Sequence, residues 1–213
     1  MHFPSPIEAF LHWESKSPNQ VFFRQPFDRK FKTWTYGQAG QEIRKIATAL
    51  QDLGLKKGDH VALLSKNCAH WIMADLAMSA AGLVSIPIYP TLNAESINQI
   101  LVHSESKAII IGKLDDYSKQ KSGITDIPVI SVEAYGESDG TSWESLVQSK
   151  APMEQPVIME PSDLMTIIYT SGTTGVPRPN VKTWGDLVVV AKKMGRRLQI
   201  NKGDEIAIAA TVP

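Results

Sequence analysis

Apolar residues near the N-terminus recur at helical spacing. A capping-box pattern at 35–38 (Thr-Tyr-Gly-Gln) begins one predicted helix, and Gly54 ends it. Its buried face is formed by Ile43, Ile46, Leu50 and Leu53. A shorter helix is predicted to start at Ser5-Pro6, and two short strands are expected at 21–24 and 31–35. The first part of the chain therefore combines helices with a small pair of strands.

From Val61 onward, short apolar runs alternate with helical patterns. Strands are predicted at 61–64, 83–88, 108–111 and 129–132. Asn67 and Asn93 can each cap a helix between these runs, and the sequence Thr-Ser-Trp-Glu at 141–144 begins one more short helix. The strands are too apolar to have one wet face, which is typical of parallel sheets buried on both sides. We therefore expect an α/β fold with a mostly parallel, doubly wound sheet covered by helices.

The last part of the chain begins with a proline-containing stretch at 149–161, interpreted as a linker. A buried strand at 164–169, a polar loop, a helix and a strand at 205–210 are predicted after it. One face of that helix carries Leu187, Val190, Met194 and Leu198. We divide the chain into an N-terminal segment at 1–60, an alternating β/α unit at 61–150, and a third segment at 151–213 that begins a second β/α unit.

Composition and charge narrow the class of protein. Lys plus Arg and Asp plus Glu both number 22, so a broad basic surface for nucleic acid is not expected. Cys68 is the single cysteine, which excludes an intrachain disulfide and favours a reducing compartment. The most apolar stretch, 71–89, contains Asp75 and Pro87 and does not fit a membrane span. No secretory signal is recognised, so a cytoplasmic location is expected.

The loop after the strand at 164–169 carries the candidate chemistry. Glycines let a backbone approach a ligand closely, hydroxyls donate to phosphate oxygens, and an arginine adds positive charge. We predict a phosphate-binding site formed by Thr170, Ser171, Gly172, Thr173, Thr174, Gly175 and Arg178. An ordinary surface turn would have a similar composition, and the loop is not a Walker A motif because Pro177-Arg178 replaces Lys-Ser/Thr.

The whole string at 169–178, Tyr-Thr-Ser-Gly-Thr-Thr-Gly-Val-Pro-Arg, closely resembles the signature of the adenylate-forming (AMP-binding) enzymes. Upstream stretches at 35–38, 53–62 and 81–90 are also similar to that family. The Pro-Ile-Tyr-Pro-Thr sequence at 87–91 favours its long-chain fatty acyl-CoA synthetases. The resemblance covers the chain from about residue 33 and implies an incomplete N-terminal domain of the adenylate-forming fold, without the C-terminal domain.

That resemblance implies a two-step reaction. A carboxylic acid attacks the α-phosphate of ATP, with Mg²⁺ present, and coenzyme A then displaces AMP. The hydroxyls of the loop would stabilise the departing pyrophosphate, while Gly172 and Gly175 give the loop flexibility. The family's other nucleotide contacts and its catalytic lysine lie further along relatives, so no catalytic or metal-binding residue is assigned here. The chain alone is expected to be inactive.

Several alternatives stay open from the sequence. Arg178-Pro179 stands where the family has Lys-Gly, and proline has no amide hydrogen to donate. The chain could be a non-catalytic nucleotide- or protein-binding module, or it could adenylate an amino acid or aryl acid. Peripheral contact with a membrane is compatible with the pattern. His70 is interpreted as a packing or capping residue and Cys68 as a small buried residue.

Overall fold

The computed structural model describes residues 5–170, 178–201, 203, 204 and 206. Its centre is a seven-stranded sheet in the order β7-β6-β5-β3-β4-β8-β9, in which every pairing is parallel except β8 with β9. The strands are β3 (His60–Leu64), β4 (Val84–Ile88), β5 (Ala108–Ile111), β6 (Val129–Ser131), β7 (Thr141–Ser142), β8 (Leu164–Thr170) and β9 (Arg178–Thr183). The predicted mostly parallel α/β architecture is confirmed.

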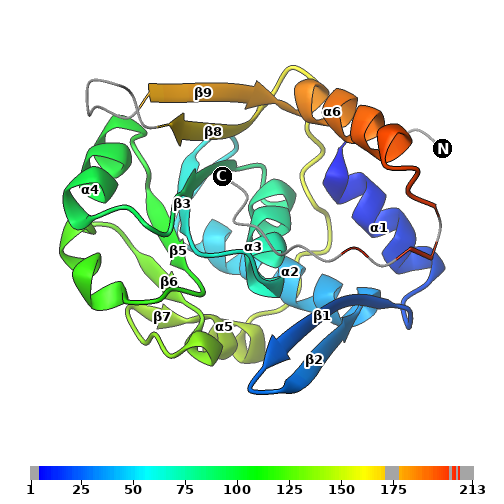
Figure 1. The fold of residues 1–213 in the computed structure, drawn as a ribbon, viewed down its shortest axis with the longest axis horizontal. Coiled ribbons are helices and arrows are strands. Elements are labelled where there is room, and N and C mark those ends of the chain that lie inside the picture. Colours follow the sequence, from blue (N-terminus) through cyan, green and yellow to red (C-terminus); the bar gives the residue numbers. More distant parts are fainter. Residues whose placement is uncertain (1–4, 171–177, 202, 205, 207–213) are drawn as a thin grey trace.

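Helices cover both faces of this sheet (Figure 1). They are α1 (Pro6–Lys16), α2 (Tyr36–Asp52), α3 (Ala69–Ala80), α4 (Ala94–His103), α5 (Trp143–Ser149) and α6 (Trp184–Arg197). Three short 3-10 helices follow β5 and β6: η1 (Tyr117–Lys119), η2 (Lys121–Gly123) and η3 (Glu133–Tyr135). A separate antiparallel hairpin is formed by β1 (Val21–Phe27) and β2 (Lys30–Thr35).

Side chains along β3 point alternately to the two faces of the sheet, and this explains why helices cover both faces. Val61 and Leu63 pack into one core with α2 and α3, whereas Ala62 and Leu64 pack into a second core with α4. All four residues are at most 1% exposed. A strand of this kind has no solvent-exposed face, which is the physical basis of the doubly wound arrangement.

Helix starts were predicted from capping residues, and most are confirmed. The side chains of Ser5, Thr35, Asn93 and Ser142 each accept a hydrogen bond from a backbone amide in the first turn. The prediction for Asn67 is wrong, because α3 begins one residue later. Its cap is Cys68, whose extended backbone lets Sγ accept from the amide of Trp71 at 3.3 Å.

Two strands were not anticipated. The two-residue strand β7 lies at one edge of the sheet and β9 at the other. Both β8 and β9 join the same sheet as β3 to β7, although their residues lie in the predicted third segment of the chain. The boundaries at 60/61 and 150/151 stay a prediction. The strand predicted at 205–210 lies almost wholly outside the described residues.

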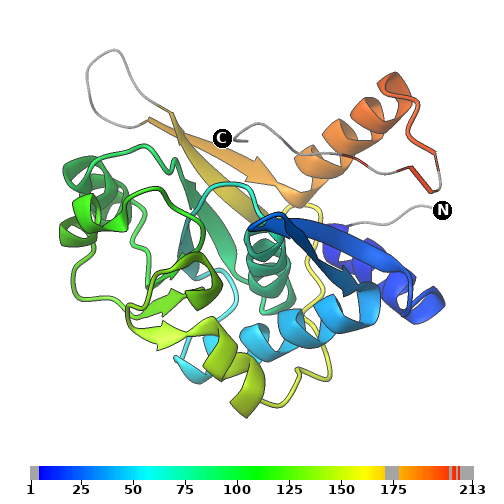
Figure 2. The same cartoon turned by 60° about the horizontal axis from the view of Figure 1, so that its bottom comes forward.

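The helix predicted around Leu187 is confirmed as α6, which projects from the body of the fold (Figure 2). Its apolar face is not covered by the described residues: Val190, Met194 and Leu198 are 50–62% exposed. Trp184 alone in this helix is buried, against Met159 and Met165. None of the helices in the described residues combines the length and apolar character that a bilayer span requires.

Candidate functional site

The predicted phosphate site begins and ends on two paired strands. Thr170 is the last residue of β8 and Arg178 the first of β9, and they are partners in the antiparallel register. Both side chains are exposed, at the end of the ladder where residues 171–177 connect the two strands. The remaining predicted site residues, Ser171, Gly172, Thr173, Thr174 and Gly175, lie outside the described residues, so their part in the site stays a prediction. The structure does place the two ends of the predicted loop side by side.

The buried side chain of Tyr169 anchors the end of β8 in the core. Its side chain is 3% exposed, and its hydroxyl lies 2.8 Å from Nδ1 of His103, the last residue of α4. The two rings also meet edge to face at 5.6 Å between centroids. Burial raises the pKa of Tyr169, so its hydroxyl remains protonated at neutral pH. The residue before Thr170 is therefore held by the core of the fold.

Pro179 is accommodated without loss of a ladder hydrogen bond. It pairs with Tyr169 in the register of β8 and β9. Because proline cannot donate, this pair is of the non-hydrogen-bonded kind, and the neighbouring pairs at Arg178 and Asn180 carry the ladder bonds. The missing amide of Pro179 thus faces the free edge of the sheet. Such a proline also discourages edge-to-edge association.

The ends of β3 and β5 form a second polar feature, which was not predicted from the sequence. The connection after β3 leads to β4 on one side, and that after β5 leads to β6 on the other, the arrangement at which open α/β sheets bind ligands. The hydroxyl of Ser65 accepts from the amide of Lys113 at 2.9 Å, and Lys66 forms an ion pair with Asp115. The sequence signal for this feature was the position of two basic residues, Lys66 and Lys113, shortly after two buried strands.

Gly112 is required at this place. A Cβ atom there would lie 2.4 Å from the hydroxyl oxygen of Ser65 and 2.8 Å from its Cβ. The two strand ends therefore meet through Ser65 with no room for a larger residue. We infer a close-packed, polar sheet edge between β3 and β5.

The described donors fit a phosphate group better than a metal ion. Thr170 supplies a hydroxyl and Arg178 a guanidinium, both suited to phosphate oxygens. No group of three or more His, Cys, Asp or Glu side chains within the described residues could hold a metal ion. A single threonine hydroxyl does not define a Mg²⁺ site. The described residues thus account for contacts to phosphate and do not define a place for the expected metal.

His70 and Cys68 are packing residues, as predicted. His70 is 2% exposed, and its Nδ1 lies 2.9 Å from the hydroxyl of Tyr135. Its ring meets Trp34, Tyr135 and Trp143 edge to face. Burial, with a smaller contribution from the charge of Lys32, lowers the pKa of His70 to about 4 against the opposing effect of Glu144. Cys68 is 7% exposed. The neutral imidazole of His70 is part of an aromatic cluster.

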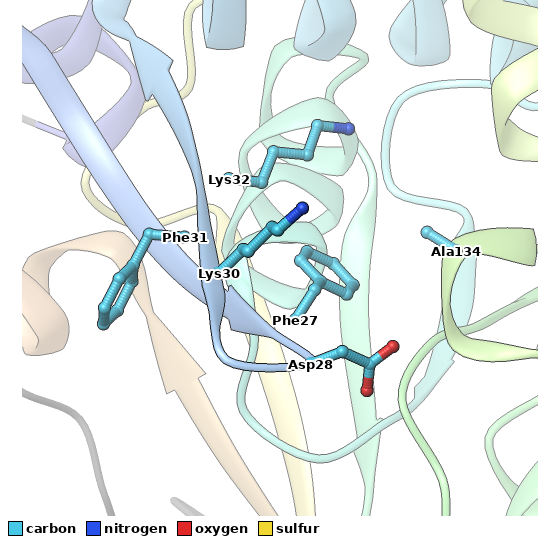
Figure 3. Close-up of a pocket in the computed structure, with 6 residues that line it drawn as sticks. All are labelled: Phe27, Asp28, Lys30, Phe31, Lys32 and Ala134. Carbon is cyan, nitrogen blue, oxygen red and sulfur yellow. The ribbon is translucent and has the colours of Figure 1, made fainter.

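An open surface pocket of about 720 Å³ lies beside the β1–β2 hairpin (Figure 3). The hairpin is away from the paired ends of β8 and β9 (Figure 1). Phe27, Lys30 and Lys32 project from one side of the hairpin, and Phe31 projects from the other (Figure 3). Lys32 also places its ammonium 4.3 Å from the ring centroid of Trp34. None of the predicted site residues lines this pocket.

Solved structures with the same fold are adenylate-forming ligases. A fatty acyl-adenylate ligase from L. pneumophila, in complex with acyl adenylate and pyrophosphate, aligns with a TM-score of 0.75 at 24% identity, over 94% of this chain and 34% of that chain. A benzoate CoA ligase from Burkholderia xenovorans aligns with a TM-score of 0.72 at 18% identity, over 88% and 36%. At these identities the likeness concerns the fold alone.

The sequence comparison defines the family. A family model described as "AMP-binding enzyme" matches residues 10–212, and the chain belongs to this family. The long-chain-fatty-acid–CoA ligase FadD15 of Mycobacterium bovis is 28% identical over 188 residues, which are 84% of this chain and 31% of the relative. Fatty acyl-CoA synthetase A of Dictyostelium discoideum is 30% identical over 174 residues, 74% and 26%. The chain thus spans less than a third of these relatives.

Proposed function

We propose that the chain is the N-terminal part of an ATP-dependent long-chain fatty acid–CoA ligase. The observation that carries the proposal is the strand–loop–strand unit with Thr170 opposite Arg178, within a chain of the AMP-binding family. The fatty acyl relatives named above support a fatty acid as the substrate. The ligands are then ATP with Mg²⁺, a fatty acid and coenzyme A.

In the proposed adenylation step, the carboxylate oxygen of the fatty acid attacks the α-phosphorus of ATP, and the bond to the bridging oxygen of pyrophosphate breaks. Negative charge grows on the departing pyrophosphate. The guanidinium of Arg178 and the hydroxyl of Thr170 would contact its oxygens and stabilise that charge. Tyr169, held by His103, would keep the base of the loop in position. Formation of the thioester then releases AMP.

Only part of this cycle is assigned to the chain. Since it spans less than a third of its two named relatives, we propose that it binds phosphate groups of the nucleotide but does not complete acyl-CoA formation. The test is a coupled pyrophosphate-release assay with the 213-residue chain, ATP, Mg²⁺, coenzyme A and a fatty acid. No release above the enzyme-free blank is expected, and steady turnover would contradict this part of the proposal.

Binding measurements separate the remaining candidates. Calorimetric titrations would use ATP, AMP and two non-hydrolysable acyl-adenylate analogues, one with a fatty acyl and one with an aryl group. We expect ATP to bind and the fatty acyl analogue to bind more tightly than the aryl one. Tighter binding of the aryl analogue would support the aryl-acid alternative. Absence of binding to every nucleotide would support a protein-binding module instead.

A further inference from the structure

The C-terminal half of α6 exposes a continuous row of apolar side chains. Val190, Met194 and the C-cap residue Leu198 follow one another four residues apart, so they lie on one side of the helix and form an apolar stripe. Each is at least half exposed, and Figure 2 shows that α6 extends away from the body of the fold. At the other end of the helix, the buried Trp184 holds the first turn in the core. The apolar stripe is therefore a candidate contact surface.

The same part of α6 carries a cluster of positive charge. Its exposed basic residues form no ion pair with any carboxylate among the described residues; they are Lys192, Lys193, Arg196 and Arg197. Asp186, the acidic residue of this helix, uses its carboxylate at the helix start, where it accepts a hydrogen bond from the amide of Thr183 at 3.0 Å. Because the formal net charge of the whole chain is zero, the end of α6 is a local concentration of positive charge.

The basic residues form two pairs that lie at different positions around the helix. Lys193 and Arg197 each come three residues after an apolar residue of the stripe, so this pair lies beside the stripe. Lys192 and Arg196 come two residues after the same apolar residues, so this pair lies on the opposite side of the helix. Long basic side chains beside an apolar surface cover it with their methylene groups and keep their charged ends in polar surroundings. The end of α6 is thus amphipathic, with positive charge at the border of its apolar side.

We propose that the end of α6 binds the surface of an anionic lipid membrane. The apolar stripe would lie at the boundary between headgroups and acyl chains, and Lys193 and Arg197 would contact lipid phosphates. Helices with an apolar side and basic residues bind membranes in this way, and each Lys or Arg near the surface strengthens the binding. A second copy of the chain is a less suitable partner, because pairing two identical stripes would bring the basic residues of both helices together. The proposed contact requires neither ATP nor ligase activity.

The width of the helix allows the two basic pairs to be distinguished by experiment. An α-helix with its side chains is about 10 Å across, and the Debye length at physiological ionic strength is about 8 Å. The headgroups that Lys193 and Arg197 contact would therefore be largely screened from Lys192 and Arg196. The double variants Lys193→Gln/Arg197→Gln and Lys192→Gln/Arg196→Gln remove the same charge and differ only in the side of the helix that loses it.

The test is co-sedimentation of the 213-residue chain, without nucleotide, with two kinds of lipid vesicle at physiological ionic strength. One kind contains phosphatidylcholine alone, and the other contains equal parts of phosphatidylcholine and phosphatidylglycerol. We expect binding to the anionic vesicles to be stronger by about tenfold or more. Lys193→Gln/Arg197→Gln should weaken that binding by about tenfold, and Lys192→Gln/Arg196→Gln by less than about threefold. Met194→Gln should weaken it by about threefold or more, because an amide replaces an apolar group in the stripe.

Absence of binding to the anionic vesicles, or equal binding to both kinds, would overturn the proposal. Equal losses in the two double variants would overturn it too, and so would full binding by Met194→Gln. All the replaced side chains are exposed, so the variants should keep the wild-type thermal midpoint, which serves as the folding control. Sedimentation equilibrium without vesicles tests the second copy as the partner. A dimer that Met194→Gln abolishes would also overturn the proposal.

Discussion

Thr170 lies opposite Arg178 across the antiparallel ladder of β8 and β9, so the two described ends of the predicted phosphate loop are neighbours. This pairing gives the predicted loop a fixed base. The hydroxyl and the guanidinium are exposed at the same end of the ladder, where an anion could contact both. The loop signature, which resembles the adenylate-forming family in sequence, thus has a defined structural setting in the family's fold.

Pro179 should be replaceable at little cost, because its position faces the free edge of the sheet. Pro179→Ala is expected to change the free energy of unfolding by less than about 1 kcal/mol. Asn180→Pro, one residue further along β9, should cost about 3 kcal/mol because it removes a ladder donor. Urea denaturation of both variants measures the difference. Similar costs at the two positions would show that the register argument is wrong.

The contact between Tyr169 and His103 should stabilise the base of the loop. Tyr169→Phe removes the hydroxyl that lies 2.8 Å from Nδ1 of His103 and is expected to cost about 1 kcal/mol. A double-mutant cycle with His103→Ala isolates the interaction. We expect the double variant to be less destabilised than the sum of the single variants. Strictly additive losses would mean that the two side chains do not stabilise each other.

Glu42 on α2 links this helix to β2 and to α5 through the indole groups of two tryptophans. Its carboxylate accepts hydrogen bonds from Nε1 of Trp34 on β2 at 2.8 Å and of Trp143 on α5 at 3.1 Å. Both indole side chains are at most 2% exposed. Glu42→Leu leaves two buried N–H groups unpaired and should cost about 2–4 kcal/mol. Glu42→Gln, which keeps one acceptor oxygen, should cost less by thermal denaturation; an equal loss would contradict this account.

His70 should make the fold sensitive to mild acid. Its pKa is lowered from 6.5 to about 4 in the folded chain, so at pH 8 the imidazole of His70 is neutral in both the folded and the unfolded chain. As the pH falls below 6.5, the unfolded chain binds a proton at this site that the folded chain does not. The free energy of unfolding should therefore fall by about 2 kcal/mol between pH 8 and pH 5 from this group alone.

The matched variant is His70→Gln, which removes the titrating ring. Its loss of stability between pH 8 and pH 5, measured by urea denaturation, should be smaller than the wild-type loss by about 2 kcal/mol. Carboxyl groups contribute equally to both proteins and cancel in the comparison. The same loss in both proteins would show that His70 is not the group responsible.

Patterns confined to one element were sufficient to predict the helices and the central strands. Thr35 with Gln38, Asn93 and Ser142 mark helix starts through hydrogen bonds within the first turn, and the buried runs from β3 to β6 are mostly apolar. The start of α3 was misplaced by one residue because a thiol, a weaker acceptor than the amide of Asn67, forms the cap.

The features that were missed depend on partners distant in the sequence. The strand β9 contains Pro179 and polar neighbours with no strand periodicity, and it exists because β8 offers a free edge. The pairing of Ser85 with Thr166 likewise arises only when β4 and β8 assemble. The contact between Ser65 and Gly112 joins the ends of two strands more than 40 residues apart.

The central claim is that the unit formed by β8, the loop and β9 binds the pyrophosphate end of ATP. The most direct measurement is calorimetric titration of inorganic pyrophosphate into the wild-type chain, Arg178→Gln and the charge-matched control Lys192→Gln on the exposed surface of α6. We predict binding by the wild type and the control, and a loss of about fivefold or more in affinity for Arg178→Gln. No binding by the wild type, or equal affinity in all three proteins, would contradict the claim.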